Sequence, residues 1–465
     1  MPNNFLDSQF SSQFNSQLNS QFIKPDGSNR EVIRQMGYAF VDLITDEVLA
    51  NQSQDFVKDA SVLKLDIPKV GMDWQDLLLE VRSQVLPRSL NLNNPRYMGH
   101  MDSVPLAITI WADALASAIN NNMLSSELAP LFTRIEADLM SWFGQLFGLG
   151  DCSFGTLTSG GSLANITALL IARNHKLPEI KSDGIKNSIN DKLVAFISDA
   201  AHTSFDKGMN VIGLGSKNLI RVETNASGQV KPDILEAKIQ EQLKLGNIPF
   251  LVGAIAGTTI TGVVDHIQSV GEIARKYNCW FHVDAAYGGA AILSPKWQHL
   301  LSGIEQADSI TFNPQKWMWI ARTCAMLLVN DRQHLIDGFD HTLPYMADNS
   351  LNFGNFNLQG TRRTDSLKLW LALRSLGLDG YAQLIDNSMH KAQALRVWVD
   401  NSADLELVCE PTMNIVCIRS LNPDLDNRKL RQQWIDQGKL WLSLPLWQGE
   451  RILKAVVLHP YAQWD

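Results

Sequence analysis

The chain has 465 residues, of which 45% are hydrophobic and 19% are charged, as expected for a globular protein with more than one domain. Its net charge of -8 argues against a nucleic-acid or anionic-membrane surface, because both require clustered Lys and Arg. The five cysteines form no C-x-x-C pair, which favours reduced thiols in the cytoplasm. Neither a membrane span nor a signal peptide is expected, since no apolar run approaches about 18 residues and no basic segment precedes one.

The N-terminal region divides into two segments. Residues 1–28 contain the repeat FLDSQFSSQFNSQLNSQF, whose scattered Phe cannot bury enough surface to offset the entropy of ordering. We expect a disordered polar arm there. Over residues 29–90 the apolar spacing is helical, which predicts a helical segment with a role in dimerisation.

Residues 91–360 have the pattern of a large α/β domain. A long amphipathic helix is predicted over residues 125–149. Helical stretches then alternate with β-branched or aromatic runs, and these runs are LVAFIS (193–198), NLIRVE (218–223), FLVGAIAG (250–257), WFHVD (280–284), SITF (309–312) and AMLLV (325–329). The alternation predicts a mostly parallel sheet with ligands at the carboxyl ends of its strands.

A smaller C-terminal domain is expected over residues 361–465. It begins with a predicted helix at 364–377 and contains strand-like runs near 413–420 and 452–460. The preceding loop, residues 336–363, is rich in Asn and Gly and is long enough to suggest a function.

The run SITFNPQKWMW (309–319) places Lys316 after a strand and beside two tryptophans. A lysine can lay its methylene groups along aromatic surface and keep its ammonium in water. Burial would instead lower the pKa of the amine and allow it to attack a carbonyl. The residues that accompany Lys316 must decide between these readings.

A glycine-rich turn enters a helix at TSGGSLANITALLIARNH (158–175). Gly161 permits close approach of the backbone, and Ser162 with the first helical N–H groups can bind phosphate. The same residues also cap ordinary helices. The motif lacks the P-loop lysine and the spaced glycines of a dinucleotide fingerprint.

Three polar residues follow other predicted strands. Asp284, in WFHVDAAYGGA, could cap a helix or ligate a metal, but no cluster with metal spacing stands beside it. It could also keep a pyridine nitrogen protonated. His202 and Thr259 follow two further strands, where a lone histidine is more often structural. With Lys316, these motifs place an amine, an acid, an imidazole, hydroxyls and a phosphate cradle at one edge of the sheet.

Together the motifs resemble the pyridoxal-phosphate-dependent amino-acid decarboxylases of the group that contains the glutamate, aromatic-amino-acid, diaminobutyrate and aspartate decarboxylases. The likeness runs from about Asn94 to Arg374, with HVDAAYGG and NPQKW as its most specific segments. It implies a fold-type I enzyme with a mostly parallel seven-stranded sheet, and a homodimer with sites at the subunit interface. The implied cofactor is pyridoxal 5'-phosphate, and the implied reaction converts an L-amino acid to its amine and CO₂.

The resemblance assigns cofactor roles position by position. Lys316 matches the lysine that holds the cofactor covalently, and Asp284 resembles the partner of the pyridine nitrogen. Ala286 matches the small residue against the ring, and His202 the imidazole stacked on its other face. His282, on the same strand face as Asp284, is a candidate for orienting that carboxylate.

Further positions follow from the same resemblance. Gly161, Ser162 and Asn313 fall where the family binds phosphate. Thr259 corresponds to a threonine near the cofactor's oxygen and the substrate carboxylate. Ser103, in NPRYMGHMDSVP, lies where the family's N-terminal segment can face the substrate.

Two loop residues carry the remaining expectations. Gln315 replaces a histidine of many members, and because an amide cannot titrate, this departure favours the bacterial aspartate- or diaminobutyrate-type members over the animal aromatic enzymes. Tyr345 matches a catalytic-loop tyrosine that returns a proton to Cα in the neighbouring subunit's site, although an isolated tyrosine is more often a packing residue.

Two alternatives remain open. The same cofactor also supports aldehyde synthesis and retro-aldol cleavage. A catalytically silent scaffold is a third reading, but it would have no need for Lys316, Asp284 and His202 together. No residue identifies the substrate side chain.

Overall fold

The computed structural model describes residues 21–50, 55–57, 59, 61, 67, 69–185, 192–339, 344–345 and 351–464. The chain divides into two compact units. One consists of Met1–Tyr97, Gln433–Trp441 and Asp465, and the other of Met98–Gln432 and Leu442–Trp464. Most of the polar repeat in residues 1–28 lies outside the described residues. In the described part of the chain, no helix is both long and apolar enough to cross a membrane.

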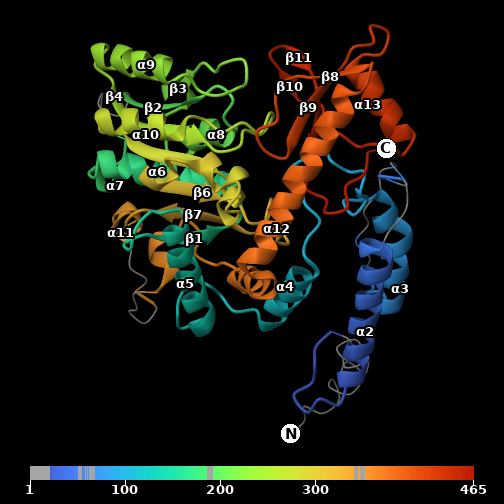
Figure 1. Cartoon of the computed structure of the whole chain (residues 1–465). Coiled ribbons are helices and arrows are strands. Elements are labelled where there is room, and N and C mark those ends of the chain that lie inside the picture. The colour runs from blue at the N-terminus through green and yellow to red at the C-terminus, as the bar shows by residue number, and fades with distance from the viewer. Residues whose placement is uncertain are drawn as a thin grey trace. The chain divides into compact units, whose positions relative to one another are not determined.

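The N-terminal unit is helical, as the spacing over residues 29–90 predicts. Helix α2 (Arg30–Asp42) continues as a π-helix (Leu43–Leu49), and α3 (Trp74–Glu80) continues through Val81–Val85 to a 3₁₀ turn at Leu86–Arg88. The two helices lie side by side (Figure 1). Several of their apolar side chains are exposed: Tyr38, Phe40, Val41, Leu77, Leu79 and Val85. Clustered apolar surface of this kind commonly marks a partner site.

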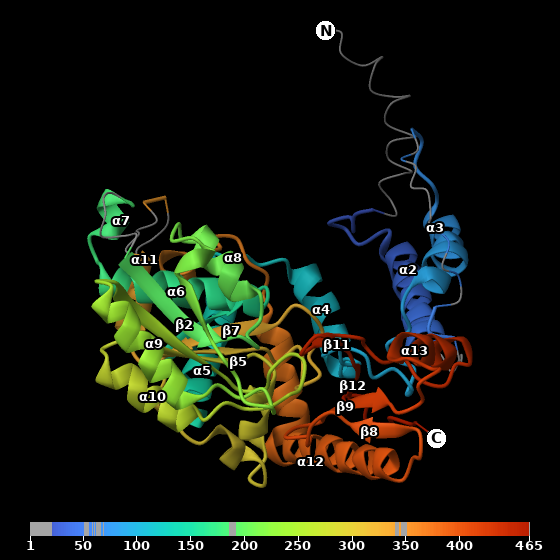
Figure 2. The same cartoon turned by 90° about the horizontal axis from the view of Figure 1, so that it is seen from above.

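The second unit is built on a seven-stranded sheet within the described residues (Figure 2). Its strands are β1 (Phe154–Thr158), β2 (Leu193–Ser198), β3 (Leu219–Val222), β4 (Ile248–Ile255), β5 (Trp280–Ala285), β6 (Ser309–Phe312) and β7 (Ala325–Val329). They lie in the order β1-β7-β6-β5-β4-β2-β3. Only β7 reverses direction, pairing antiparallel with β6 and β1. The prediction of a mostly parallel sheet is confirmed.

Helices precede, connect and follow these strands. They are α4 (Ala107–Ile119), α5 (Pro130–Leu146), α6 (Gly161–Lys176), α7 (Ile180–Asp183), α8 (Ser204–Val211), α9 (Pro232–Lys244), α10 (Ile267–Lys276) and α11 (Arg332–Phe339). Helix α5 begins at Pro130, five residues after the predicted start, because proline suits the first helical turn. Helix α11 extends to Phe339, so the predicted loop over 336–363 begins later.

The two faces of the sheet carry different helices. Helix α6 covers the face of β5 that bears His282 and Asp284, since Asn165 of α6 hydrogen-bonds to both. Helix α10 covers the opposite face, where a Cβ at Gly271 would lie 2.8 Å from the ring of Phe281. Glycine at this position lets the helix approach the sheet closely.

The C-terminal part of this unit contains a long helix and a small sheet. Helix α12 (Ser366–Asp400) extends well beyond the predicted end at Gly377, where a φ of 64° produces a kink. It leads to β8 (Leu405–Leu407), β9 (Ile415–Ser420) and β12 (Leu453–Val456), which pair antiparallel in the order β12-β9-β8. Helix α13 (Asn427–Asp436) and the short pair β10 (Leu446–Trp447) and β11 (Glu450–Arg451) lie between β9 and β12 in the sequence.

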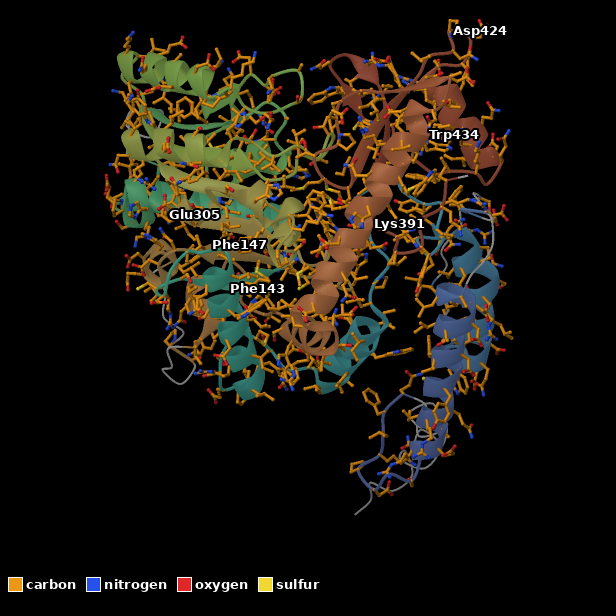
Figure 3. The ribbon with its side chains drawn as sticks, viewed as in Figure 1. Phe143, Phe147, Glu305, Lys391, Asp424 and Trp434 are labelled. Carbon is orange, nitrogen blue, oxygen red and sulfur yellow. The ribbon has the colours of Figure 1, made fainter. Side chains whose placement is uncertain are left out.

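Aromatic packing supports the strand that precedes Lys316. Phe143 points from α5 toward the sheet, and Phe147 directly follows the end of that helix (Figure 3). Their ring centroids lie 5.7 and 5.6 Å from that of Phe312, the last residue of β6. All three side chains are fully buried, so aromatic packing holds the end of β6 in place.

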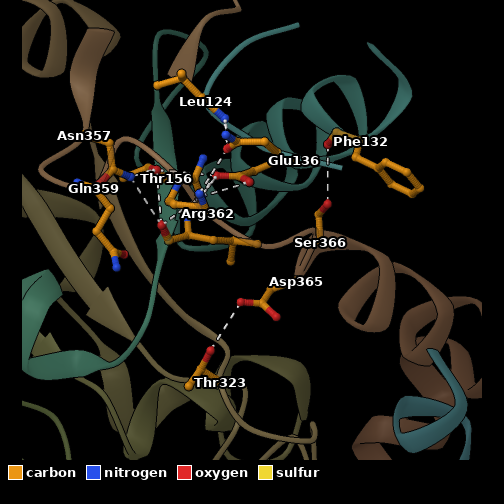
Figure 4. Close-up of polar contacts among 12 residues, drawn as sticks. Leu124, Phe132, Glu136, Thr156, Thr323, Asn357, Gln359, Arg362, Asp365 and Ser366 are labelled. Atoms are coloured by element: carbon orange, nitrogen blue, oxygen red, sulfur yellow. Dashed lines mark hydrogen bonds and ion pairs between the residues drawn. The ribbon is translucent and has the colours of Figure 1, made fainter. Parts of the chain in front are cut away.

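A buried ion pair stabilises the region between α5, β1 and the segment before α12 (Figure 4). Arg362 Nη1 donates to Glu136 Oε1 at 2.9 Å and Oε2 at 3.2 Å, and to the carbonyl of Leu157 at 3.1 Å. The backbone N–H of Leu157 also donates to Glu136 Oε1. Asn357 Nδ2 bonds to Thr156 Oγ1 beside them.

Candidate active site

A cavity of about 260 Å³ lies at the carboxyl ends of β4, β5 and β6. Most of the predicted site residues line it, and these are Gly161, Ser162, His202, Thr259, Asp284, Ala286, Asn313 and Lys316. The lining also includes Met101, Asn165 and Gln315. Segments that are far apart in the sequence therefore converge at the edge where parallel sheets bind ligands.

Lys316 presents its amine to this cavity. Its Nζ lies 3.9 Å from Met101 Sδ. Desolvation by burial lowers the pKa of the Lys316 amine, while the carboxylates of Asp284 and Asp102 oppose that shift. A lowered pKa provides more of the neutral amine that attacks a carbonyl.

The two tryptophans beside Lys316 are held in the core by their own hydrogen bonds. The indole N–H of Trp317 donates to Ser388 Oγ, and that of Trp319 donates to the carbonyl of Leu458, both at 2.8 Å. Both residues are almost completely buried. Their role is to fix the backbone around the lysine, which favours the chemical reading of Lys316.

Asp284 is a buried carboxylate held by neutral donors. It is 6% exposed. Its Oδ2 accepts from Asn165 Nδ2 at 2.9 Å, and its Oδ1 accepts from the backbone N–H of Ala286 at 3.1 Å. Among the described residues, no cationic side chain pairs with it within 4.0 Å. A carboxylate in this state is suited to bind a positively charged ligand group.

The opposite end of the cavity has the features of a phosphate cradle. Gly161 begins α6, and a Cβ on it would lie 2.8 Å from Asn313 Nδ2, so a side chain there would displace Asn313. Asn313 is 3% exposed, and its Oδ1 has no partner among the described residues. Ser162 and the N-terminal N–H groups of the helix face the same space. These residues fit the phosphate of the cofactor that the sequence implies.

Glycine is not sterically required at Gly160. A Cβ there would meet no atom within 4 Å, and the residue has an extended backbone. Of the two glycines in the turn, Gly161 is therefore the one that the site needs.

His202 and Thr259 reach the cavity from two loops. The His202 Nδ1 accepts from the backbone N–H of Ser204 at 3.1 Å, which orients the ring. Desolvation lowers the pKa of His202, with Asp284 acting in the opposite direction. Thr259 is exposed at the cavity wall, whereas Thr258 is buried and bonds to Thr261.

Gln315 and Ser103 stabilise the loop around Lys316. Gln315 Oε1 accepts from the backbone N–H of Cys324 at 2.6 Å, and its own N–H donates to the carbonyl of Cys324. Ser103 Oγ donates to the carbonyl of Gln315 at 3.4 Å and is absent from the cavity lining. The nearby residue that does line the cavity is Met101.

Tyr345 is 68% exposed and is also absent from this lining. The residues on both sides of Pro344 and Tyr345 lie outside the described part of the chain. The described structure therefore brings together the cofactor positions but leaves the role of Tyr345 a prediction.

The sequence reading overlooked Lys454, on β12. It is 3% exposed, and its Nζ donates to the carbonyl of Thr259 at 3.0 Å. Desolvation lowers its pKa to about 8. The signal was available as one charged residue inside the apolar run ILKAVVL, where burial of an amine is unusual.

His282 interacts with Asp284 through an intermediary. It is fully buried, and its Nε2 lies 3.2 Å from Asn165 Oδ1. Asn165, in turn, donates to the carboxylate. The expected influence of His282 on Asp284 therefore passes through a residue that the sequence reading did not select.

Comparisons with known proteins show which family this chain resembles. A family model described as pyridoxal-dependent decarboxylase conserved domain matches residues 58–421. An aromatic-L-amino-acid decarboxylase of Bacillus atrophaeus is 28% identical over 450 residues, covering 92% of each chain. Tryptophan decarboxylase 2 of Oryza sativa subsp. japonica is 29% identical, covering 93% of this chain and 92% of its own. The apo crystal structure of mouse CSAD superposes with a TM-score of 0.87 at 26% identity, covering 93% of this chain and 95% of that one.

Proposed function

This chain belongs to the pyridoxal-dependent decarboxylase family, and we propose how its own side chains carry out the reaction. It is a fold-type I carboxy-lyase that converts an L-amino acid to its amine and CO₂ with pyridoxal phosphate as cofactor. When bound, the cofactor accepts the electrons of the bond to the departing carboxylate. The observation that supports the assignment of roles is the single cavity shared by Lys316, Asp284 and the Gly161 turn.

Lys316 holds the cofactor covalently, and the other side chains orient it. Asp284 keeps a proton on the ring nitrogen, because a buried anion favours the positively charged form of its neighbour. His202 and Ala286 would hold the cofactor from opposite sides of its ring. Gly161, Ser162 and Asn313 would bind its phosphate, and Thr259 would contact an oxygen of the cofactor and the substrate carboxylate. Ser103 would act on the substrate side, although its hydroxyl contacts the Lys316 loop and it does not line the cavity.

Lys454 attracts the substrate carboxylate. Its amine is buried next to Thr259, whose carbonyl it contacts, and Thr259 lines the cavity. Lys316 lowers the pKa of Lys454 by repulsion, after the larger effect of desolvation, so the two amines share one electrostatic environment. A carboxylate that enters this environment offsets the cost of burying the Lys454 charge.

Tyr345 returns the proton to Cα, in the neighbouring subunit's site. Two points support this role. Tyr345 lies in a polar loop, at a sequence distance beyond Lys316 that matches the catalytic-loop tyrosine of family members. A phenol can also donate a proton once water is excluded. Tyr345→Phe keeps the ring and removes only the hydroxyl. Amine release should fall by a factor on the order of 10², while substrate still binds. Amine formation at the wild-type rate would leave Tyr345 a packing residue.

The substrate is an L-amino acid with an aromatic side chain. The two curated relatives carry aromatic substrates in their names, and the Met101 thioether beside Lys316 suits contact with an aromatic ring. Aspartate and diaminobutyrate are the alternative that Gln315 favours.

A panel of L-amino acids tests this choice. The purified enzyme is incubated with each amino acid, and CO₂, amine, aldehyde and hydrogen peroxide are quantified. Equimolar CO₂ and amine from an aromatic amino acid are expected. Preference for aspartate or diaminobutyrate would overturn the substrate class, whereas aldehyde with hydrogen peroxide would overturn the reaction outcome.

The enzyme acts as a cytoplasmic homodimer through its N-terminal helices. The exposed side chains of Tyr38, Phe40 and Leu79 provide apolar area for an isologous contact. The five cysteines are free, which suits a reducing compartment. Sedimentation should show a dimer, and Phe40→Asp with Leu79→Asp should shift it to monomer with loss of activity. An active wild-type monomer would contradict the assembly.

A further inference from the structure

A row of hydrogen-bonded side chains links Trp280 to Asp284 on one buried face of the sheet. Trp280 Nε1 lies 2.8 Å from Ser309 Oγ, which lies 2.8 Å from His282 Nδ1. On the other side of the imidazole, Nε2 lies 3.2 Å from Asn165 Oδ1. Asn165 Nδ2 completes the row by donating to Asp284 Oδ2 at 2.9 Å. Every member is buried, so water does not compete for these bonds.

Chemistry allows one direction of donation along the row. The indole of Trp280 can only donate, so Ser309 Oγ accepts from it and has its own proton free for His282 Nδ1. At the other end, the Asp284 carboxylate accepts, which turns the NH₂ of Asn165 toward it and the amide oxygen toward His282. His282 Nε2 must then carry a proton. All four bonds point toward the carboxylate.

A neutral imidazole satisfies both of its neighbours. Complete burial lowers the pKa of His282 to about 4, with Asp284 acting in the opposite direction. Neutral His282 donates from Nε2 and accepts at Nδ1, which matches Asn165 and Ser309. The phenyl ring of Phe205, with its centroid 5.9 Å from that of the imidazole, packs beside it.

We propose that Asn165, His282 and Ser309 are positioning residues that hold the Asp284 carboxylate in place and aim it at the ring nitrogen of the cofactor. The inference rests on the proposed role of Asp284 and extends it to Asn165 at the cavity wall and to His282 and Ser309, which do not line the cavity. Aligned donors polarise one another, so each member strengthens the last bond to the carboxylate. Asn165 has a further anchor, because its Nδ2 also donates to Ser204 Oγ at 2.9 Å.

Two cofactors that differ only at the ring nitrogen separate positioning from structural damage. Dissociation constants are measured for the cofactor-free protein with pyridoxal phosphate and with 1-deazapyridoxal phosphate, in which a CH group replaces the nitrogen. The wild-type protein should prefer pyridoxal phosphate. Asn165→Leu should reduce that preference about tenfold or more, since a hydrogen bond to a charged group is lost. Equal weakening of both ligands would show structural damage only and would overturn the proposal.

Variants of the other hydrogen-bonded residues test whether the loss of cofactor preference decreases with distance from Asp284, and whether a conservative variant recovers it. His282→Leu should reduce the preference, whereas His282→Gln should restore much of it, because its amide can donate to Asn165 Oδ1. Ser309→Ala and Trp280→Phe should have smaller effects in that order. Thr311→Val is the matched control, because Thr311 is buried opposite Asp284 in the sheet and its hydroxyl has no partner among the described residues. A failed rescue or an effect of Thr311→Val as large as that of His282→Leu would contradict the row.

The tautomer of His282 tests the direction without any cofactor. In ¹⁵N-histidine-labelled protein, the signal lost in His282→Gln identifies the residue. A protonated Nε2 and an unprotonated Nδ1 at neutral pH are expected, and the opposite tautomer or an imidazolium would refute the proposal. If the wild-type protein shows this tautomer but no preference between the two cofactors, the proposed role of Asp284 fails while the row stands.

Discussion

Two buried carboxylates in this protein are satisfied in different ways. Glu136 is 0% exposed and is matched by the guanidinium of Arg362, which also bonds to the carbonyl of Leu157. Asp284 is 6% exposed and is held by an amide and a backbone N–H, with no cation paired to it in the described residues. One negative charge is neutralised within the fold, and the other is only solvated by dipoles.

The difference separates a structural acid from a functional one. The charge of a buried carboxylate that is paired with a cation is already compensated, and the loss of one partner leaves an uncompensated charge in the core. A buried carboxylate with neutral donors stays available for an external positive charge, which in our proposal is that of the protonated ring nitrogen. Burial alone does not distinguish the two, but the charge of the hydrogen-bond partners does.

Removal of the charge of Glu136 should have the largest effect, and it should be on stability. Glu136→Gln leaves Arg362 buried without an anion, and we expect a loss of about 3–5 kcal/mol in the free energy of unfolding. Denaturant unfolding measures it. Asp138→Asn, which removes an exposed partner of Arg134 on the same helix, should change the free energy by about 0.5 kcal/mol or less. Equal losses in the two variants would break the comparison.

Asp284→Asn should give the reverse pattern. Decarboxylation should fall by about 10²–10³ because the electrostatic partner of the ring nitrogen is lost. The free energy of unfolding should fall far less than in Glu136→Gln, since no cation is left unpaired. Steady-state amine release and denaturant unfolding are measured on the same preparation. A fully active Asp284→Asn enzyme would remove the residue from the mechanism.

Much of the sheet was predictable because its central strands are continuous apolar runs. The predicted bounds of β2, β6 and β7 match the observed ones. Strand β1 was missed because FGTLT is short and contains a glycine, and its position depends on pairing with β7. Gly377 gave the usual signal for the end of a helix, yet packing along α12 continues the helix past the kink.

The site was predictable where a motif carries the residue. Asp284 and Lys316 stand in distinctive segments, whereas Asn165 is one polar residue within a helix and acquires its role only through contact with β5. Lys454 lies 138 residues after Lys316 in the sequence. Only the fold brings it into contact with Thr259.

Lys454 extends the comparison to a buried cation. Lys454→Met should raise KM for the amino acid about tenfold at neutral pH, because a bond to a charged group is lost. In the wild-type enzyme, KM should rise as pH increases through about 8, where the Lys454 amine loses its proton. Lys454→Arg stays charged and should remove that rise.

The pH dependence of the free energy of unfolding of the same variants tests the direction of the Lys454 pKa shift. Because the pKa of Lys454 is lower in the folded protein than its usual 10.5, the unfolded chain binds more protons between pH 8 and 10.5. Its contribution therefore destabilises the fold below pH 8 and disappears as pH rises to 10.5. Wild-type stability should rise over that window relative to Lys454→Met, and identical pH profiles would contradict a buried, uncompensated amine.

The protonation state of the cofactor nitrogen tests the central claim most directly. Cofactor labelled with ¹⁵N in the ring is bound to the wild-type enzyme and to Asp284→Asn, and its nitrogen chemical shift is recorded across neutral to alkaline pH. The account predicts a protonated nitrogen in the wild-type enzyme throughout the range in which the fold is stable, and an unprotonated one in Asp284→Asn. An unprotonated nitrogen in the wild-type enzyme at neutral pH would show that Asp284 does not receive a ligand cation.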